Sequence, residues 1–453
     1  GVRLVGSEMC IRDSAEVQGT AVRQVRMELP TDTVALLRTL PGYESFNVVV
    51  EILMLDKPGY GLNDAPRAWG LRLKKHMLEV QDMHPCRTDE CVYVGREKSL
   101  FVALVSAHVD DLKITADPNR VKRIVELLEK DFDKLKLEWN NFAHCGIRHM
   151  QDPTTFEITL DQIEYIKMLR AIDTSCLRGK PPEEKVDEAM IAKFMSLLGG
   201  AAWVVQTRMD VCVHVVYLQS QAKTPSVLDI HRLNKLVRYM QRVPCKLRYK
   251  KIVGPVTLMA IVDSAYKRED EKGHELCVAV YGLVASSGDR PDGDMQVIEW
   301  SCRKQKHVTR STWTSELFAT CNALDMSLLL VGMFHEIYVA GSSDPDSLRS
   351  KVRETSLAPY PLALRTDSCS VFKAVQATDV KVPTEKSTLY HVQWTHELLP
   401  RCGLRNIFWI DTRDMVADGL NKGTVPRDAL RNLMTTGKWE VKHEFSRFSR
   451  AKM

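Results

Sequence analysis

The sequence predicts an N-terminal α+β region, then a helical region, then a C-terminal α/β domain. Three observations predict this order. Two adjacent carboxylates, Asp110 and Asp111, interrupt a run of apolar β-formers, which is typical of a hairpin turn. Apolar residues recur at helical spacing between about 160 and 243. After residue 251, strand-like and helix-like segments alternate, which is typical of an α/β domain.

The composition is that of a globular intracellular protein. Hydrophobic residues make up 44% of the 453 residues and charged residues 27%, so the chain can form about two to four ordinary domains. The twelve cysteines are scattered without a repeated Cys-x-x-Cys pattern, which is typical of reduced thiols. No apolar stretch reaches the roughly 18 residues of a membrane span, so no membrane partner is expected. The net charge of +5 permits a nucleic-acid partner without requiring one.

The elements of the first region follow from short patterns. Residues 1–14 show no periodicity and are interpreted as an adapter-derived, non-native leader outside the fold. A basic helix is predicted from Ala65 to about Val80, with a proline near its start. Strands over 91–94 and 100–105 lead into the acidic turn, and an amphipathic helix follows over 119–135.

The acidic turn has two interpretations from the residues alone. It is either a solvated hairpin turn, where aspartate is common, or a cation site, because adjacent carboxylates resist joint ionisation unless a cation offsets their charge. A divalent cation such as Mg²⁺ suits the second interpretation. His84, Cys86 and Cys91 lack a fourth ligand at zinc-site spacing, so we do not assign zinc to them.

The helical region ends in a basic helix over about 229–243. Its cations share one face, and eight cations with no acid lie between Arg232 and Lys251. Such a face suits a nucleic-acid phosphate backbone, although charged faces are often merely solvated. The four cations that recur at helical spacing are Arg232, Lys235, Arg238 and Arg242.

In the last domain, acids stand at the ends of predicted elements. Strands are expected over 256–262, 277–284, 296–302, 362–365 and 406–410, and Ser311 is expected to cap a helix. Asp263 and Asp367 follow strands, whereas Glu316 and Asp418 lie at helix starts. Taken singly, each acid is explained as a turn cap or as a first-turn acid favoured by the helix dipole. Four together predict a second divalent-metal centre.

Six motifs in this order resemble Ty1/copia-type retrotransposon Pol polyproteins. Residues 57–69 resemble "YGLKQAPRAW", and residues 108–111 resemble the "YVDD" turn of the reverse transcriptase. Residues 208–211 and 238–240 resemble "RPDI" and "RYL" of the segment that follows. Residues 300–306 and 417–422 resemble "WSSKKQ" and "ADxLTK" of the ribonuclease H region.

The resemblance implies a domain organisation. We expect a partial reverse transcriptase over 15–150, an α+β palm-like polymerase remnant without fingers. A helical connection over 151–250 and an α/β ribonuclease H-like domain over 251–425 follow, with a basic C-terminal tail over 426–453. It further implies that the chain is truncated at its N-terminal side and begins after the family's first catalytic aspartate. The loss of this aspartate would cripple polymerisation.

The resemblance also implies site residues and ligands. Asp110 and Asp111 would bind metal in the polymerase, and Asp263, Glu316, Asp367 and Asp418 would bind it in the nuclease. The metal would be Mg²⁺, with Mn²⁺ as a possible substitute, acting in two-metal displacement. RNA template, DNA, RNA–DNA hybrid and other products of the same polyprotein are the implied partners. The expected nucleic-acid contacts are Arg67, Arg232, Lys235, Arg238, Arg242, Arg303, Lys304 and Lys306.

Some residues depart from the family pattern. His108 replaces the tyrosine of the turn, and Asn63-Asp64 replaces Lys-Gln beside the expected nucleotide position. A catalytically decayed or domesticated nucleic-acid-binding protein without turnover therefore stays as the alternative function. We expect an intracellular location, either cytoplasmic particles or the nucleus, and no address signal in the sequence decides between them.

Overall fold

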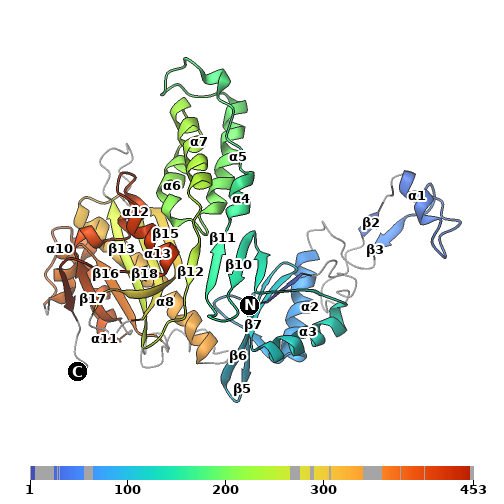
Figure 1. The fold of residues 1–453 in the computed structure, drawn as a ribbon, viewed down its shortest axis with the longest axis horizontal. Coiled ribbons are helices and arrows are strands. Elements are labelled where there is room, and N and C mark those ends of the chain that lie inside the picture. Colours follow the sequence, from blue (N-terminus) through green and yellow to red (C-terminus); the bar gives the residue numbers. More distant parts are fainter. Residues whose placement is uncertain are drawn as a thin grey trace. The chain divides into compact units, whose positions relative to one another are not determined.

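The computed structural model describes residues 2–5, 25–27, 29, 31–55, 65–265, 276–285, 290–305, 308–339, 360–377, 379–401 and 404–448. Contacts divide the chain into two compact units, Gly1–Trp139 and Asn140–Met453 (Figure 1). The sequence placed its domain boundaries near 150 and 250 instead. The second unit joins the helical region to the C-terminal α/β region, because residues of both share one apolar core, which includes Met209, Leu247 and Met259.

The first unit is built on a six-stranded antiparallel sheet with two helices. The strand order is β4-β5-β6-β7-β1-β8. The main helices are preceded by a separate pair of strands, β2 (Val25–Met27) and β3 (Leu53–Leu55), and by the helix α1 (Thr31–Leu37). The elements of the sheet and its helices are β1 Val2–Val5, α2 Ala65–Glu79, β4 Met83–Pro85, β5 Val92–Glu97, β6 Leu100–His108, β7 Asp111–Ala116, α3 Pro118–Phe132 and β8 Lys136–Trp139.

The helix α3 buries the apolar face that its amphipathic sequence pattern predicted. In α3, Val121, Ile124 and Leu128 recur at helical spacing and are buried. The Asp117 side chain accepts from the backbone N–H of Asn119 and so caps the start of α3. The predicted helices over 65–80 and 119–135 are confirmed to within a few residues.

The exclusion of residues 1–14 from the fold needs correction. Val2–Val5 forms β1, which pairs antiparallel with β7 on one side and β8 on the other. The physical reason is that β7 and β8 each have an unpaired edge that one further extended segment satisfies on both sides. A segment without sequence periodicity can meet this requirement because the ladder uses backbone groups. Its proposed non-native origin stays a prediction.

The second unit begins with a four-stranded sheet and a helical bundle. The sheet has the order β12-β11-β10-β9. The helical region predicted between about 160 and 243 is confirmed by α5 and α7, and the basic helix predicted over about 229–243 is α7. The element bounds are β9 Asn141–His144, β10 Ile147–Gln151, β11 Ile158–Asp161, α4 Ile163–Met168, α5 Glu188–Val204, α6 Cys212–Ser220, α7 Val227–Arg242 and β12 Leu247–Tyr249.

A seven-stranded sheet forms the centre of the C-terminal region, in the order β18-β15-β14-β13-β16-β17-β19. β13 is antiparallel to β14 and parallel to β16, and β16 is parallel to β17. The bounds are β13 Val256–Ala265, β14 Leu276–Ala285, β15 Gly293–Lys304, α8 Thr312–Tyr338, β16 Leu362–Thr366, α10 Cys369–Gln376, α11 Leu389–Arg401, β17 Leu404–Ile410, α12 Asp418–Asn421, α13 Asp428–Thr436, β18 Lys438–Trp439 and β19 Phe445–Phe448.

Alternation along the strands gives this sheet a separate core on each face. Leu258, Ala260 and Val262 of β13 belong to the core under α8, α10 and α11. Met259 and Ile261 belong to the opposite core, together with residues of α6, α12 and α13. This arrangement confirms an α/β region with helices on both faces of a mixed sheet.

The helix α8 is long and apolar enough to cross a membrane by length and composition alone, but half of its most apolar window is buried. Its apolar residues cover β13 and β14, which accounts for the composition.

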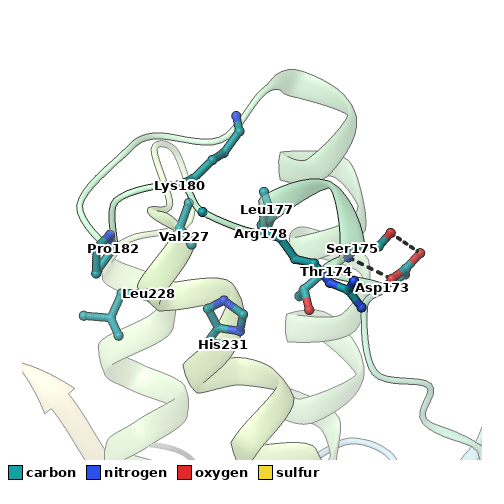
Figure 2. A pocket seen from close by; sticks show the side chains of 11 residues that line it. Asp173, Thr174, Ser175, Leu177, Arg178, Lys180, Pro182, Val227, Leu228 and His231 are labelled. Atoms are coloured by element: carbon teal, nitrogen blue, oxygen red, sulfur yellow. Dashed lines mark hydrogen bonds between the residues drawn. The ribbon is translucent and has the colours of Figure 1, made fainter.

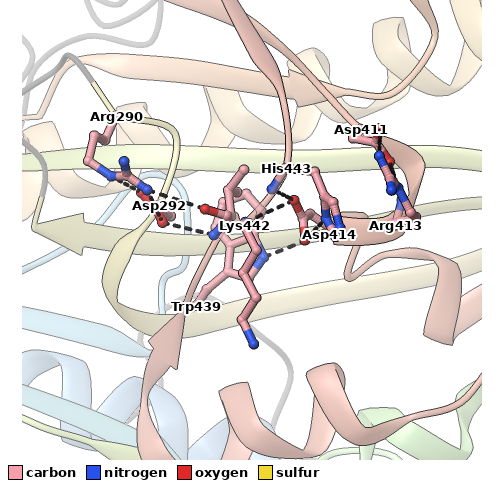
Figure 3. A network of polar contacts seen from close by, with 9 residues as sticks. Arg290, Asp292, Asp411, Arg413, Asp414, Trp439, Lys442 and His443 are labelled. Atoms are coloured by element: carbon pink, nitrogen blue, oxygen red, sulfur yellow. Dashed lines mark hydrogen bonds and ion pairs between the residues drawn. The ribbon is translucent and has the colours of Figure 1, made fainter.

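The predicted basic tail over 426–453 is also corrected. Leu430, Leu433 and Trp439 are buried in the core, and β18 and β19 complete opposite edges of the sheet. Polar contacts hold the segment between these strands (Figure 3). The Asp414 carboxylate accepts from the backbone N–H groups of Lys442 and His443, at 2.9 and 2.7 Å. A charged composition therefore does not make this segment a free tail.

Candidate metal centre

Parallel register brings Asp263 and Asp367 together. β13 pairs with β16, and the last paired positions are Ile261 and Arg365. Asp263 and Asp367 each lie two residues beyond that pair, so both carboxylates emerge at the same end of neighbouring strands. Asp263 is 1% exposed, whereas Asp367 is half-buried.

Asp418 joins them from a distant part of the chain. It is the first residue of α12, and it is buried. One carboxylate oxygen from each of Asp263, Asp367 and Asp418 lies within 4.8 Å of the others. Three of the four predicted nuclease acids therefore converge at one point, although 155 residues separate the first from the last.

Glu316 lies beside this group without belonging to its closest set. It is in the first turns of α8, whose start is capped by the Ser311 side chain as predicted. The side chain of Glu316 is 6% exposed, and among the described residues its Oε2 atom has no hydrogen-bond partner. A buried carboxylate oxygen without a donor is costly, so this atom is suited to a ligand.

A polar network holds the start of α8 against β13. The Ser264 hydroxyl contacts the Ser315 hydroxyl, and Gln305 Nε2 donates to both the Oγ and the backbone oxygen of Ser315, each at 3.0 Å. All three residues are buried. They fix the neighbouring Glu316 with respect to Asp263. None of the three was predicted as a site residue, although Gln305 lies in the motif over 300–306.

Three further residues missed by the sequence analysis contact the carboxylates directly. Lys422 Nζ lies 2.5 Å from Asp418 Oδ1 and 3.4 Å from Asp263 Oδ2. Asn421 Nδ2 donates to Asp263 Oδ2 at 2.7 Å, and the Thr412 hydroxyl donates to Asp367 Oδ2 at 2.9 Å. The spacing of Asp418 and Lys422, four residues apart at a helix start, was a usable signal for an ion pair.

Burial and mutual repulsion raise the pKa values of the acids. Burial is the largest cause for Glu316, followed by the charge of Asp263, and its pKa rises to about 9. Burial also raises the pKa of Asp418, to about 7, together with its hydrogen bond to Asp263. The pKa of Asp367 is raised, first by burial and then by Asp263. Like charges held close together resist joint ionisation, as this cluster shows.

The residues fit a divalent cation. The donor set is carboxylate oxygen, which is what Mg²⁺ and Mn²⁺ prefer. The cluster is short of positive charge, because Lys422 is its one basic contact among the described residues. A bound divalent ion would offset the repulsion that raises the pKa values, and it would satisfy the orphan oxygen of Glu316.

We expect the metal-free protein to lose stability as pH rises. The folded state retains protons on Glu316 and Asp418 that the unfolded chain releases near the ordinary values of 4.5 and 3.8. Folding therefore takes up protons above these values, and the free energy of unfolding falls through the window from about pH 4.5 to about 9. Thermal unfolding in EDTA should therefore show a lower melting temperature at pH 8 than at pH 5. Saturating Mg²⁺ should flatten this slope, and a slope unchanged by Mg²⁺ would contradict metal binding at the cluster.

The second predicted acid pair lies at the tip of a two-stranded hairpin in the first unit. His108 pairs with Asp111 across β6 and β7, which leaves Val109 and Asp110 as the turn. Both aspartates are half-buried. Among the described residues, no third carboxylate, imidazole or thiol lies close enough to complete a metal-binding group with them. The predicted hairpin is confirmed, and its role in binding metal stays a prediction.

The helix of the "APRAW" motif supports this turn. Trp69 is buried in the core of the first unit, and its indole N–H donates to the backbone oxygen of Val109. Val109 has a φ of 55°, which is unusual for a β-branched residue. The tryptophan therefore satisfies the turn carbonyl while filling the core beneath it. Residues 56–64, which include Asn63 and Asp64, lie outside the described residues.

The predicted nucleic-acid contacts are solvent-facing where they are described. Arg303 and Lys304 are exposed at the end of β15. Register places Cys302 opposite Val278 and Val278 opposite Asp263, so Arg303 and Lys304 lie at the same end of the sheet as the acids. Arg67 is exposed on α2 of the first unit. Lys306 lies outside the described residues.

The basic helix α7 confirms the predicted division into two faces. Leu233, Leu236 and Val237 are buried, and the four predicted cations are exposed. Arg232 pairs with Asp229 and stacks over Tyr217. No ion pair is formed with another described residue by Lys235, Arg238 or Arg242, so these three remain available for phosphate groups.

The helical region carries a pocket of about 390 Å³ (Figure 2). Its lining comes from residues 173–182 and from the start of α7, at Val227, Leu228 and His231. The first N–H groups of α7 are already satisfied, because Val227 and Leu228 donate to the backbone oxygens of Glu184 and Pro182. None of the predicted site residues lines this pocket, so we assign no catalytic role to it.

Comparisons with known proteins agree with the resemblance seen in the motifs. No protein-family model matches the chain. The chain is 24% identical over 363 residues to the retrovirus-related Pol polyprotein from transposon RE1 of Arabidopsis thaliana, and 23% identical over 360 residues to that from transposon RE2. Each match covers 77% of this chain and 23% of the relative, so the chain spans about a quarter of the relatives' length. The chain is thus similar to retrovirus-related Pol polyproteins from transposons, and the resemblance predicted from its motifs is confirmed.

A solved structure of a foamy viral protease–reverse transcriptase in complex with double-stranded DNA also matches, with 10% identity and a TM-score of 0.42. The match covers 80% of this chain and 61% of that one. This likeness is too distant to establish a shared fold.

Proposed function

We propose that the C-terminal region is a ribonuclease H-like nuclease that hydrolyses the RNA strand of RNA–DNA hybrids with Mg²⁺, for which Mn²⁺ can substitute. The observation that supports this most directly is the convergence of Asp263, Asp367 and Asp418 within 4.8 Å, with Glu316 beside them. In the nuclease, bound divalent ions would activate water and stabilise the leaving oxygen of an in-line displacement.

The residues of the chain have separate tasks in this proposal. Asp263, Asp367 and Asp418 would hold the cations, and the orphan Oε2 of Glu316 would complete the donor set. Thr412 orients Asp367 through its hydroxyl, and Asn421 orients Asp263 through its amide. These fixed donors keep the carboxylates in position, as is common for metal-ligand partners.

Hybrid binding would use phosphate and 2′-hydroxyl contacts rather than base reading. Arg303 and Lys304, at the same end of the sheet as the acids, would contact the phosphate backbone close to the metal centre. The free cations of α7 belong to the same unit and would extend this contact.

We further propose that the first unit derives from a reverse transcriptase palm. The homologues are Pol polyproteins, and the Asp110-Asp111 hairpin with its Trp69 support resembles the polymerase turn. In this proposal the first unit descends from a polymerase, and Asp110 and Asp111 are the residues that bind the polymerase metal ions.

The test is cleavage of a labelled RNA strand in an RNA–DNA hybrid by the full chain. We expect cleavage with Mg²⁺ or Mn²⁺ and none with EDTA, and no cleavage of the DNA strand or of single-stranded RNA. Binding of the hybrid by the folded chain without any metal-dependent cleavage would support the alternative of a binding protein without turnover.

A prediction follows for the basic helix. Replacing Lys235, Arg238 and Arg242 together by alanine should weaken hybrid binding and reduce the slope of log K against log salt by about 2 to 3 units, because each phosphate contact contributes about 0.9. Fluorescence anisotropy at several salt concentrations measures this slope. The control is Lys180→Ala, since Lys180 already pairs with Glu184 at 2.8 Å. An unchanged slope in the triple variant would show that α7 is only a solvated face.

A further inference from the structure

The ammonium group of Lys422 lies among the carboxylates of the candidate metal centre. It is 2.5 Å from Asp418 Oδ1 and 3.4 Å from Asp263 Oδ2, and the charge of Asp367 also acts on it. Its side chain is 34% exposed, so it reaches the carboxylates from the surface. Lys422 is thus placed where a cation is needed.

The ammonium group cannot satisfy the centre completely. It carries one positive charge, and the group it faces comprises three carboxylates with a fourth beside them. Glu316 Oε2 stays without a described hydrogen-bond partner while Lys422 is in place. Asp263 Oδ2 accepts a hydrogen bond from the Asn421 side-chain amide and forms an ion pair with Lys422, so this oxygen already has two electropositive neighbours before any metal binds. A divalent ion that bound this oxygen would compete with both of them.

Local geometry allows the Lys422 side chain to move away from the carboxylates. It follows directly after α12, and the Lys422 backbone N–H donates to the Asp418 backbone oxygen, so the chain stays anchored when the side chain moves. Lysine has a flexible four-carbon stem and can place its ammonium group in water at little cost.

We propose that Lys422 is a built-in counter-cation of the metal centre, which holds the carboxylates together in the metal-free protein and is displaced when a divalent ion binds. This inference rests on the proposed metal site and adds a residue that sets its affinity. Lys422 is a positioning residue in this role, because it acts through Asp263 and Asp418.

The role predicts opposite effects on stability and on metal affinity. Replacing Lys422 by glutamine leaves the carboxylates without their internal cation, so the melting temperature in EDTA should fall. The same change removes a competitor for the site, so Mg²⁺ should bind about tenfold more tightly, within the usual range for coupled ligands.

The experiment measures Mg²⁺ and Ca²⁺ binding by calorimetry, and thermal unfolding with and without these ions, on the full chain. The variants are Lys422→Gln and Lys422→Arg, with Lys438→Gln as the control because Lys438 pairs with Glu440 on the surface. We expect tighter binding only for Lys422→Gln. Unchanged or weaker metal binding by a folded Lys422→Gln variant overturns the proposal.

A second measurement uses the wild-type chain and does not depend on the folding of a variant. Acetylation of Lys422, followed by peptide mass spectrometry, should accelerate several-fold when Ca²⁺ is added, while that of Lys438 should not change. Equal rates with and without Ca²⁺, in a protein that binds Ca²⁺, overturn the displacement. Failure of the wild type to bind any divalent ion would instead overturn the metal centre itself, so the two failures are distinguishable.

Discussion

Asp367→Asn should abolish metal-dependent cleavage of RNA in a hybrid while leaving the protein folded. We expect a loss of at least about a thousandfold, because a bound metal supplies several kcal/mol of transition-state stabilisation. The carboxylate of Asp367 accepts from the Thr412 hydroxyl, and an asparagine oxygen can do the same. Single-turnover cleavage of a labelled RNA–DNA hybrid measures the effect.

The stability of the same variant separates a lost ligand from a lost fold. The pKa of Asp367 is raised by burial and by Asp263, so removing this carboxylate relieves repulsion in the metal-free protein. The melting temperature in EDTA should therefore stay equal or rise, and the stabilisation by Mg²⁺ should shrink. The control is Asp428→Asn, an 80% exposed carboxylate on α13 that pairs with Arg431. A fully active Asp367→Asn variant would remove this residue from the site.

Arg208→Met should destabilise the second unit more than any surface change. Arg208 and Asp210 are both fully buried, and their bidentate contacts measure 2.8 and 2.9 Å. The guanidinium also donates to the backbone oxygen of Val243 at the end of α7. Removing it leaves Asp210 charged and buried without its partner, which costs about 3 to 5 kcal/mol. Chemical denaturation of the full chain, followed by circular dichroism, measures this loss.

The double variant Arg208→Met, Asp210→Leu tests the cause. It removes both charges, so it should recover part of the stability lost in the single variant, because the uncompensated charge is then absent. A double variant that is less stable than the single one would show that the hydrogen bonds, rather than the unpaired charge, dominate. Asp210 also accepts from Tyr239, and its backbone oxygen accepts from Arg427, so this pair links the helical bundle to the residues after α12.

The burial of the Arg208–Asp210 pair could not be predicted from the motif that contains it. From sequence, residues 208–211 were predicted only to resemble a family motif, because a charged pair two residues apart carries no sign of burial. The structure buries it under α7, where Tyr239 and the end of the helix close over it. Charged residues are seldom fully buried unless they are paired, so composition alone predicts exposure.

Local sequence patterns were sufficient to predict the secondary-structure elements and to identify the acids. Hairpin, helix and strand patterns depend on neighbours within a few residues, so the acidic turn, α3, α7 and the strands before Asp263 and Asp367 followed from local spacing. The four acids were identified through their places at element ends and through the resemblance to Pol polyproteins. Both sources use information that is written along the chain.

Long-range contacts set which of these groups come together. The parallel register of β13 and β16 sets Asp263 beside Asp367. The helix α12, which lies far along the chain, brings Asp418 to the same place, and Lys422 follows directly after it. Long-range contacts also insert Val2–Val5 between β7 and β8. In the seven-stranded sheet they place β18 and β19 at the two edges. The physical reason is that backbone ladders and carboxylate clusters are satisfied by partners far away in sequence, and local periodicity carries no record of them.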